Sequence, residues 1–116
     1  MQSDKCIFCK IARKEIPAKI VYEDDQVLAF EDTKPQAPVH VLIIPHDHIE
    51  KVSDLNEKDA VMAGKVIIAA KKIARAKGLD DSGYRIVMNC NRDAGQEVFH
   101  IHAHLMGGRK FNWPPG

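Results

Sequence analysis

The segment His100-Ile-His-Ala-His-Leu-Met106 constrains the fold of this chain more than any other feature, because histidine and apolar residues alternate along it. Side chains of a β-strand point alternately to the two faces of a sheet, whereas a helix separates residues i and i+2 by about 200°. The alternation therefore predicts a strand over residues 98–106 with all three histidines on one face. We expect this histidine face to be accessible and the opposite face, which includes Phe99, to pack into the core.

Four further segments are rich in aliphatic and β-branched residues, which favour strands. They span residues 19–23, 26–31, 39–44 and 84–89. Asp24 and Asp25 separate the first two segments and predict a hairpin turn.

One long helix is predicted between Asn56, which can cap its start, and Gly78, which suits its end. Its apolar residues recur at helical spacing: Met62, Val66, Ala69, Ala70 and Ile73. A shorter helix is expected over residues 6–14. Together these elements predict one α+β domain over residues 1–116, with an antiparallel sheet of about five strands, one long helix and a short N-terminal helix.

The charge and cysteine content exclude several classes of protein. A net charge of +1 argues against a nucleic-acid partner, because such domains are usually strongly basic. The longest apolar run, residues 39–45, is too short to cross a membrane. Residues 1–5 contain no apolar segment typical of a secretory signal, and three cysteines do not make a disulfide framework. We therefore expect a cytoplasmic protein without a membrane or nucleic-acid partner.

Three imidazoles on one face could perform several kinds of chemistry, because imidazole titrates near neutral pH. A neutral imidazole can attack phosphorus or carbon, whereas alternating histidines on a strand can also bind a metal. A purely structural role is the third interpretation. Gly95, just before the strand, could bring backbone N–H groups close to phosphate oxygens.

Several motifs resemble the histidine triad (HIT) family, and in particular its Hint branch. The histidine segment itself matches the triad pattern, and the similarity extends from about Cys6 to the end of the chain. The other matching segments are Glu15-Ile-Pro-Ala-Lys-Ile, Leu28-Ala-Phe-Glu-Asp-Thr, Pro35-Gln-Ala-Pro-Val-His, Tyr84-Arg-Ile-Val-Met-Asn and Trp113-Pro-Pro-Gly. The resemblance implies a homodimer in which the two sheets join, with a site for a purine nucleoside monophosphate in each subunit.

The same resemblance implies a phosphoramidase-type hydrolase of purine nucleotides that needs no cofactor for its chemistry. His102 would attack the α-phosphorus and form a nucleotidyl-histidine intermediate, which water then resolves to AMP or GMP. The substrate would be a nucleoside 5′-phosphoramidate or an acyl-adenylate. His104, His100 and His40 would complete the catalytic group. The implied nucleotide-binding residues are Phe30, Asp32, Thr33, Asn89, Gly95, Gln96, Glu97, Val98, His102 and His104.

Glu97 departs from the pattern of those relatives that carry serine at its position. An ionised carboxylate cannot donate a hydrogen bond and repels phosphate if it points inward. It could instead select a cationic leaving group.

Cys6 and Cys9 have the spacing of metal ligands, but a closed zinc site needs about four ligands. The resemblance to bacterial HIT proteins implies His48 and His100 as the other two, with His48 favoured over His46. Zinc would then give His100 a structural role. The alternative is that both cysteines are ordinary thiols on the short helix.

Two rival functions remain at this point. In the first, His100, His102 and His104 bind a catalytic zinc ion directly, so that a chelator would abolish turnover. In the second, the chain is a nucleotide-binding scaffold with little turnover.

Overall fold

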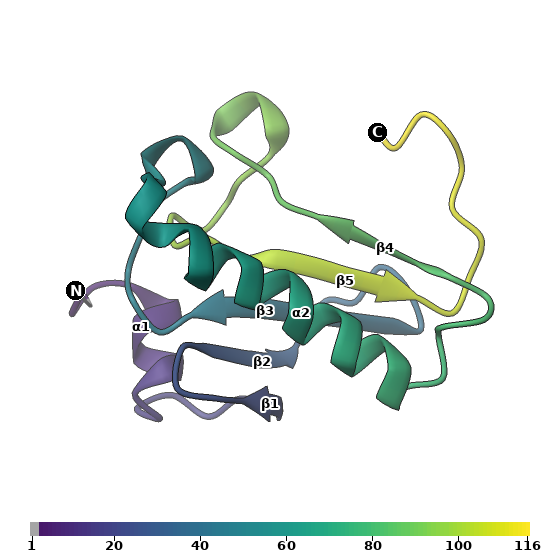
Figure 1. The fold of residues 1–116 in the computed structure, drawn as a ribbon, viewed down its shortest axis with the longest axis horizontal. Coiled ribbons are helices and arrows are strands. Elements are labelled where there is room, and N and C mark those ends of the chain that lie inside the picture. The colour runs from purple at the N-terminus through teal and green to yellow at the C-terminus, as the bar shows by residue number, and fades with distance from the viewer. Residues whose placement is uncertain (1–2) are drawn as a thin grey trace.

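The computed structural model describes residues 3–116 and contains a five-stranded antiparallel sheet with strand order β1-β2-β3-β5-β4 (Figure 1). The elements are α1 (Ile7–Ala12), β1 (Ile20–Glu23), β2 (Val27–Glu31), β3 (Val39–Pro45), α2 (Ala60–Ala76), β4 (Tyr84–Val87) and β5 (Ala103–Gly107). The predicted fold class is thereby confirmed. Met1 and Gln2, part of the segment for which the sequence predicts no secretory signal, lie outside the described residues. Among the residues described, no helix combines the length and the apolar character that crossing a membrane would require.

The predicted hairpin between β1 and β2 is present and is closed by one carboxylate. Asp24 Oδ1 accepts the backbone N–H groups of Gln26 and Val27 at 2.8 and 2.9 Å. This side-chain bonding to the backbone two and three residues ahead is why aspartate favours turns.

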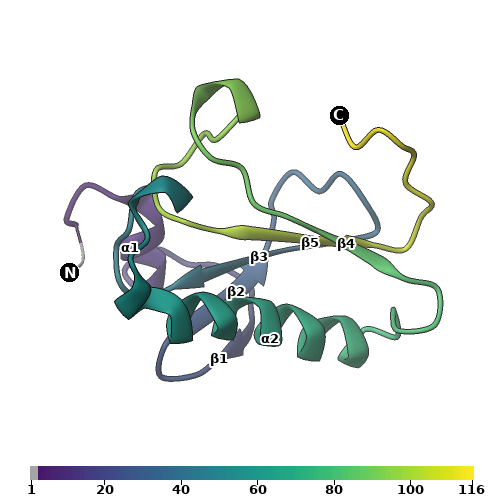
Figure 2. The ribbon, with the colours of Figure 1, turned by 45° about the horizontal axis from the view of Figure 1, so that its top comes forward.

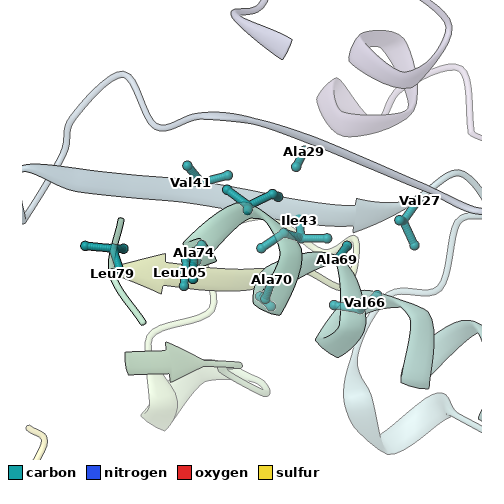
Figure 3. Packing of buried hydrophobic residues seen from close by; sticks show 12 residues of the cluster. Val27, Ala29, Val41, Ile43, Val66, Ala69, Ala70, Ala74, Leu79 and Leu105 are labelled. Carbon is teal, nitrogen blue, oxygen red and sulfur yellow. The ribbon is translucent and has the colours of Figure 1, made fainter. Parts of the chain in front are cut away.

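Both faces of the sheet are covered. Odd- and even-numbered residues of β2 and β3 point to opposite faces and therefore pack against different elements. Odd-numbered residues of β2 and β3, such as Val41 and Ile43, pack beneath α2 (Figure 3). Even-numbered residues, such as Leu42 and Ile44, pack with α1 on the other face. Figure 2 shows α2 along one face and the β4–β5 connection rising on the opposite side. Two-sided burial explains why β2 and β3 are continuous apolar runs.

The predicted start of the last strand is wrong, because β5 begins only at Ala103. Its pairing with β3 ends at Ile43, after which the backbone N–H of Ile101 is donated to the carbonyl of Ile49 at 2.7 Å. Residues 98–102 therefore leave the sheet. Phe99, expected in the core, is 41% exposed.

The histidine face is also less accessible than expected. His100 is fully buried and His102 is 8% exposed, while Ile101 and Leu105 are buried as predicted. The departure of residues 98–102 from the sheet brings these two imidazoles against α1 and the segment after β3.

Helix α2 follows the sequence pattern closely at its C-terminal end, but it begins only at Ala60, because one 3₁₀ turn over Glu57–Asp59 separates it from the predicted capping residue. Asn56 donates its backbone N–H to the Asp59 carboxylate at 2.9 Å, and this bond caps the 3₁₀ turn that leads into α2. Gly78 adopts a φ of +74° after the last turn, a conformation that favours glycine. The buried residues of α2 are Val66, Ala69, Ala70, Ile73 and Ala74, whereas Met62 is only partly buried.

Ile73→Ala tests the α2–sheet core. Ile73 is 4% exposed, so we expect its truncation to lower the free energy of unfolding by about 2–5 kcal/mol. Ile67→Ala is the matched control, because Ile67 lies on the same helix and is 43% exposed. Urea unfolding at equal protein concentration should place the control within about 1 kcal/mol of the native chain. Equal losses in the two variants would contradict the assignment of the buried face.

Candidate active site and the thiol–imidazole cluster

Cys6, Cys9, His48 and His100 form a compact cluster in which their ligand atoms all lie within 4.8 Å of one another. Nδ1 of His100 lies 3.4 Å from Cys6 Sγ and 3.3 Å from Nδ1 of His48. Cys9 Sγ lies 3.4 Å from His48 Nδ1. His46 points elsewhere, with Nε2 at 3.0 Å from the carbonyl oxygen of Asp24. The structure therefore brings together the four residues named from the sequence and leaves His46 outside.

The orientation of His100 is determined by one backbone group. Its Nε2 lies 2.8 Å from the carbonyl oxygen of Pro45, which can only accept, so Nε2 carries the proton. Nδ1 then keeps its lone pair and faces the thiols. Burial lowers the pKa of His100 to about 4, which makes the ring neutral at pH 7.

His102 has the opposite tautomer for the same kind of reason. Its Nδ1 lies 2.8 Å from the carbonyl oxygen of His100, so Nδ1 carries the proton and Nε2 keeps the lone pair. The ring contacts Phe8 edge-on, with 5.1 Å between centroids. Burial is the main cause that lowers the pKa of His102 below its usual value. The fold thus presents a neutral imidazole with a free Nε2.

A chain of hydrogen bonds orients His104. Gln36 donates its backbone N–H to Nδ1 of His40 at 3.0 Å, so the proton of neutral His40 is on Nε2. That proton is donated to Nδ1 of His104 at 2.9 Å, which leaves the Nε2–H of His104 as a free donor. Asp32 Oδ2 lies 3.5 Å from His40 Nε2. Burial first, and the neighbouring histidines second, lower the pKa of His104 to about 4.

A cavity of about 400 Å³ adjoins these imidazoles. Eight residues named from the sequence line it, namely Asp32, His40, Asn89, Gly95, Glu97, Val98, His102 and His104. Gln96 does not line it, although both of its neighbours do.

A second cavity, of about 420 Å³, is lined by two further residues named from the sequence, Phe30 and Thr33. Its walls are largely aliphatic and aromatic side chains of α1 and the sheet. Phe8, Asp32 and Leu42 line both cavities, so the two are neighbours that meet at these residues.

Sequence reasoning missed four residues that line the first cavity: Phe8, Lys34, Gln36 and Leu42. Leu42 could have been predicted from strand geometry, because it lies two residues after His40 and so on the same face of β3. Phe8 lies between the two cysteines in sequence, and no pattern in that segment predicts a cavity residue.

The three triad histidines do not point into one common metal site. Among residues 3–116, the second group of candidate ligands is Asp32, His40 and His104, without His100 or His102. In that group the close pair of nitrogens, His40 Nε2 and His104 Nδ1, already shares a proton in a hydrogen bond. The geometry therefore disfavours the zinc-hydrolase interpretation.

Comparisons with known proteins agree with this geometry. The chain is 51% identical over 107 residues to the purine nucleoside phosphoramidase of Escherichia coli strain K12, an alignment covering 92% of this chain and 90% of that relative. The crystal structure of a HIT family hydrolase from Legionella pneumophila has a TM-score of 0.95 and 54% identity, with 97% of this chain and 100% of that one covered. A histidine triad protein from Clostridium difficile has a TM-score of 0.94 and 45% identity, covering 97% of each chain.

A family model described as the HIT domain matches residues 13–111. This match and the relatives confirm the family predicted from the triad motif, and with it the assignment as a hydrolase. The chain belongs to the histidine triad family.

Proposed function

We propose that this chain is a purine nucleoside phosphoramidase that cleaves nucleoside 5′-phosphoramidates at the α-phosphate and releases AMP or GMP. One observation carries the proposal: the carbonyl of His100 holds the Nδ1 proton of His102, so the nucleophilic lone pair is on Nε2. The name of the Escherichia coli relative supports the substrate class.

The two adjoining cavities suit the two ends of a nucleotide. A purine base is flat and largely apolar, and it fits the cavity lined by Phe30 and Thr33. Asp32 lines both cavities, where its carboxylate can accept hydrogen bonds from ribose hydroxyls. The phosphate then occupies the cavity beside His102 and His104.

The chemistry proceeds in two displacements at one phosphorus atom. The Nε2 lone pair of His102 forms a bond to the α-phosphorus while the P–N bond of the substrate breaks, and the leaving nitrogen takes a proton from water. A water molecule then attacks the same phosphorus and gives a proton to the hydroxide left by the first step, the bond to His102 breaks, and the nucleoside monophosphate departs. The Nε2–H of His104 donates a hydrogen bond to a phosphate oxygen in both steps.

The segment that precedes the triad lines the first cavity and not the second: Asn89, Gly95, Glu97 and Val98 belong to the first cavity alone. We assign this part of the cavity to the leaving group, because the base and ribose occupy the residues shared with the second cavity. Glu97 is exposed, and its carboxylate favours a leaving group that carries positive charge over a second anion. Acyl-adenylates are the alternative substrates for the same two steps.

His102→Ala tests the nucleophile and separates this function from a nucleotide-binding scaffold. We expect the release of AMP from adenosine 5′-phosphoramidate, measured with a chelator present, to fall by about 10³-fold or more. His102 is buried against Phe8, so the free energy of unfolding should also fall, and each rate is expressed per folded molecule.

His46→Ala is the matched control and should keep native turnover, because His46 lies outside the thiol–imidazole cluster and lines neither cavity. A native chain that binds AMP tightly but releases none from the phosphoramidate would favour the scaffold. Turnover that survives in His102→Ala would reject the nucleophile.

We also propose that Cys6, Cys9, His48 and His100 bind a structural zinc ion. In a tetrahedral site with Zn–N bonds of about 2.05 Å and Zn–S bonds of about 2.3 Å, ligand atoms lie about 3.3 Å (N to N) and 3.6 Å (S to N) apart. The observed separations are 3.3 Å between the two nitrogens and 3.4 to 3.5 Å between sulfur and nitrogen. None of the three cysteines forms a disulfide, which leaves Cys6 and Cys9 available as zinc ligands.

Cys6→Ser tests the zinc proposal. We expect about one zinc per native chain by elemental analysis, and a variant that loses zinc and unfolds at a lower temperature. The rate per folded molecule should fall less, because zinc acts on the position of His100 and takes no part in the reaction. Cys90→Ser is the control and should retain zinc. Native protein purified without chelators that contains no zinc would refute the site.

The homodimer implied by the sequence is proposed to form along β4 and the outer face of α2. β4 is an edge strand, whose free N–H and C=O groups can pair with another chain. Val61 and Ile68 of α2 are 67% and 49% exposed, which is unusual for large apolar residues.

Ile68→Glu tests this interface. Sedimentation equilibrium of the native protein should give twice the chain mass of 13.0 kDa, and the variant should shift toward one chain mass. Lys5→Glu, exposed in the N-terminal segment and outside both α2 and β4, is the control for added negative charge. A variant that remains fully dimeric would exclude Ile68 from the interface, and a monomeric native protein would reject the dimer.

A further inference from the structure

Gln96 is a buried polar residue in an otherwise exposed loop. Its side chain belongs to a residue that is 7% exposed, whereas Gly95 and Glu97 on either side are exposed. A buried amide is costly unless its donors and acceptors are paired. The partners of this amide therefore indicate what it does.

Among residues 3–116, the hydrogen bonds of the amide are all to backbone groups. Nε2 donates to the carbonyl of Glu50 at 2.7 Å and to that of Val98 at 3.1 Å. Oε1 accepts the backbone N–H of Asn91 at 2.8 Å. Because the carbonyls only accept and the N–H only donates, the amide has one orientation, and both of its hydrogens are used.

These bonds tie the loop that lines the leaving-group side of the cavity to a second segment. Oε1 and the Gln96 backbone N–H both bond to Asn91, which closes the loop on itself. The bond to Glu50 attaches the loop to the residue next to Ile49. Ile49 in turn accepts the backbone N–H of Ile101, between His100 and His102.

We propose that Gln96 is a positioning residue, which holds Gly95 and Glu97 in the wall of the cavity without touching the nucleotide itself. This differs from the role implied by the family resemblance, in which Gln96 is a nucleotide contact. Gln96 lines neither cavity, and its amide has no hydrogen left to donate to a phosphate oxygen. The expected effect of Gln96 variants on turnover rests on the proposed function. Their expected effect on the order of the loop rests on the hydrogen bonds alone.

Gln96→Glu is the primary variant. Its carboxylate can still accept from Asn91, but it presents an oxygen in place of Nε2 to the two carbonyls. We expect kcat/KM for adenosine 5′-phosphoramidate at pH 8 to fall about ten-fold or more. In the ligand-free variant, hydrogen exchange of the N–H groups of Asn91, Gly95 and Gln96 should rise by a similar factor, while α2 keeps native exchange.

The pH dependence distinguishes positioning from general loss of stability. A carboxyl group between two carbonyls has a raised pKa, and once protonated it can donate to Glu50. Both the kinetic and the exchange defects of Gln96→Glu should therefore shrink as the pH falls from 8 to 5. Gln96→Met should show similar defects without this recovery, and it replaces the first variant if that one does not fold. Asp93→Asn, exposed in the same loop, should match the native chain in both measurements.

Three results would overturn the proposal. Lower turnover with native exchange in the ligand-free loop would make Gln96 a direct substrate contact. Faster loop exchange with native kcat/KM would show that the position of the loop does not matter to the reaction. If the native chain has no phosphoramidase activity, the proposed function fails separately, and the affinity for AMP replaces kcat/KM as the readout. Native affinity in both Gln96 variants would then reject the positioning role.

Discussion

The hydrogen bond from Nδ1 of His102 to the carbonyl of His100 is the contact on which the rest of the site depends. It joins residues two apart in the chain, in the segment just before β5 begins at Ala103. Because a carbonyl cannot donate, it fixes which nitrogen of His102 carries the proton. His100 is itself fixed by the carbonyl of Pro45 and by the thiols of Cys6 and Cys9. The nucleophile is thus oriented by backbone groups, and these are held by a second set of contacts on the far side of His100.

Burial complements this geometry by keeping the imidazoles neutral. Desolvation is the largest cause of the lowered pKa at His40, His100, His102 and His104 alike. A neutral nucleophile keeps its lone pair, and a neutral His104 bonded through His40 keeps one N–H to donate. Helix α1 and the residue that caps it contribute to both parts of the arrangement, since Cys6 (the N-cap) and Cys9 belong to the cluster while Phe8 packs on His102. A displacement of α1 would therefore alter the thiol–imidazole cluster and the cavity beside His102 together.

Much of this could be predicted from the sequence, because local patterns determine it. The 3.6-residue spacing before Gly78 located α2, and the alternation around Ala103 correctly assigned Ile101 and Leu105 to the interior. The early departure of residues 98–102 from the sheet was not predictable, since it depends on the long-range bond between Ile101 and Ile49. Phe8 was missed as a cavity residue for a similar reason: only tertiary packing brings it to His102. The clustering of His48 with Cys6 and Cys9 was anticipated through the family resemblance and not through spacing alone.

The central claim is that the fold fixes His102 in the tautomer with its proton on Nδ1. Long-range ¹H–¹⁵N correlation spectra of the ¹⁵N-labelled native protein at pH 7, assigned by comparison with His102→Ala, measure this directly. We expect the Nδ1 of His102 to show the chemical shift of a protonated nitrogen and Nε2 that of a bare one. A spectrum with the proton on Nε2, or with both nitrogens protonated, would contradict the account, because neither form has a lone pair on Nε2 to attack phosphorus.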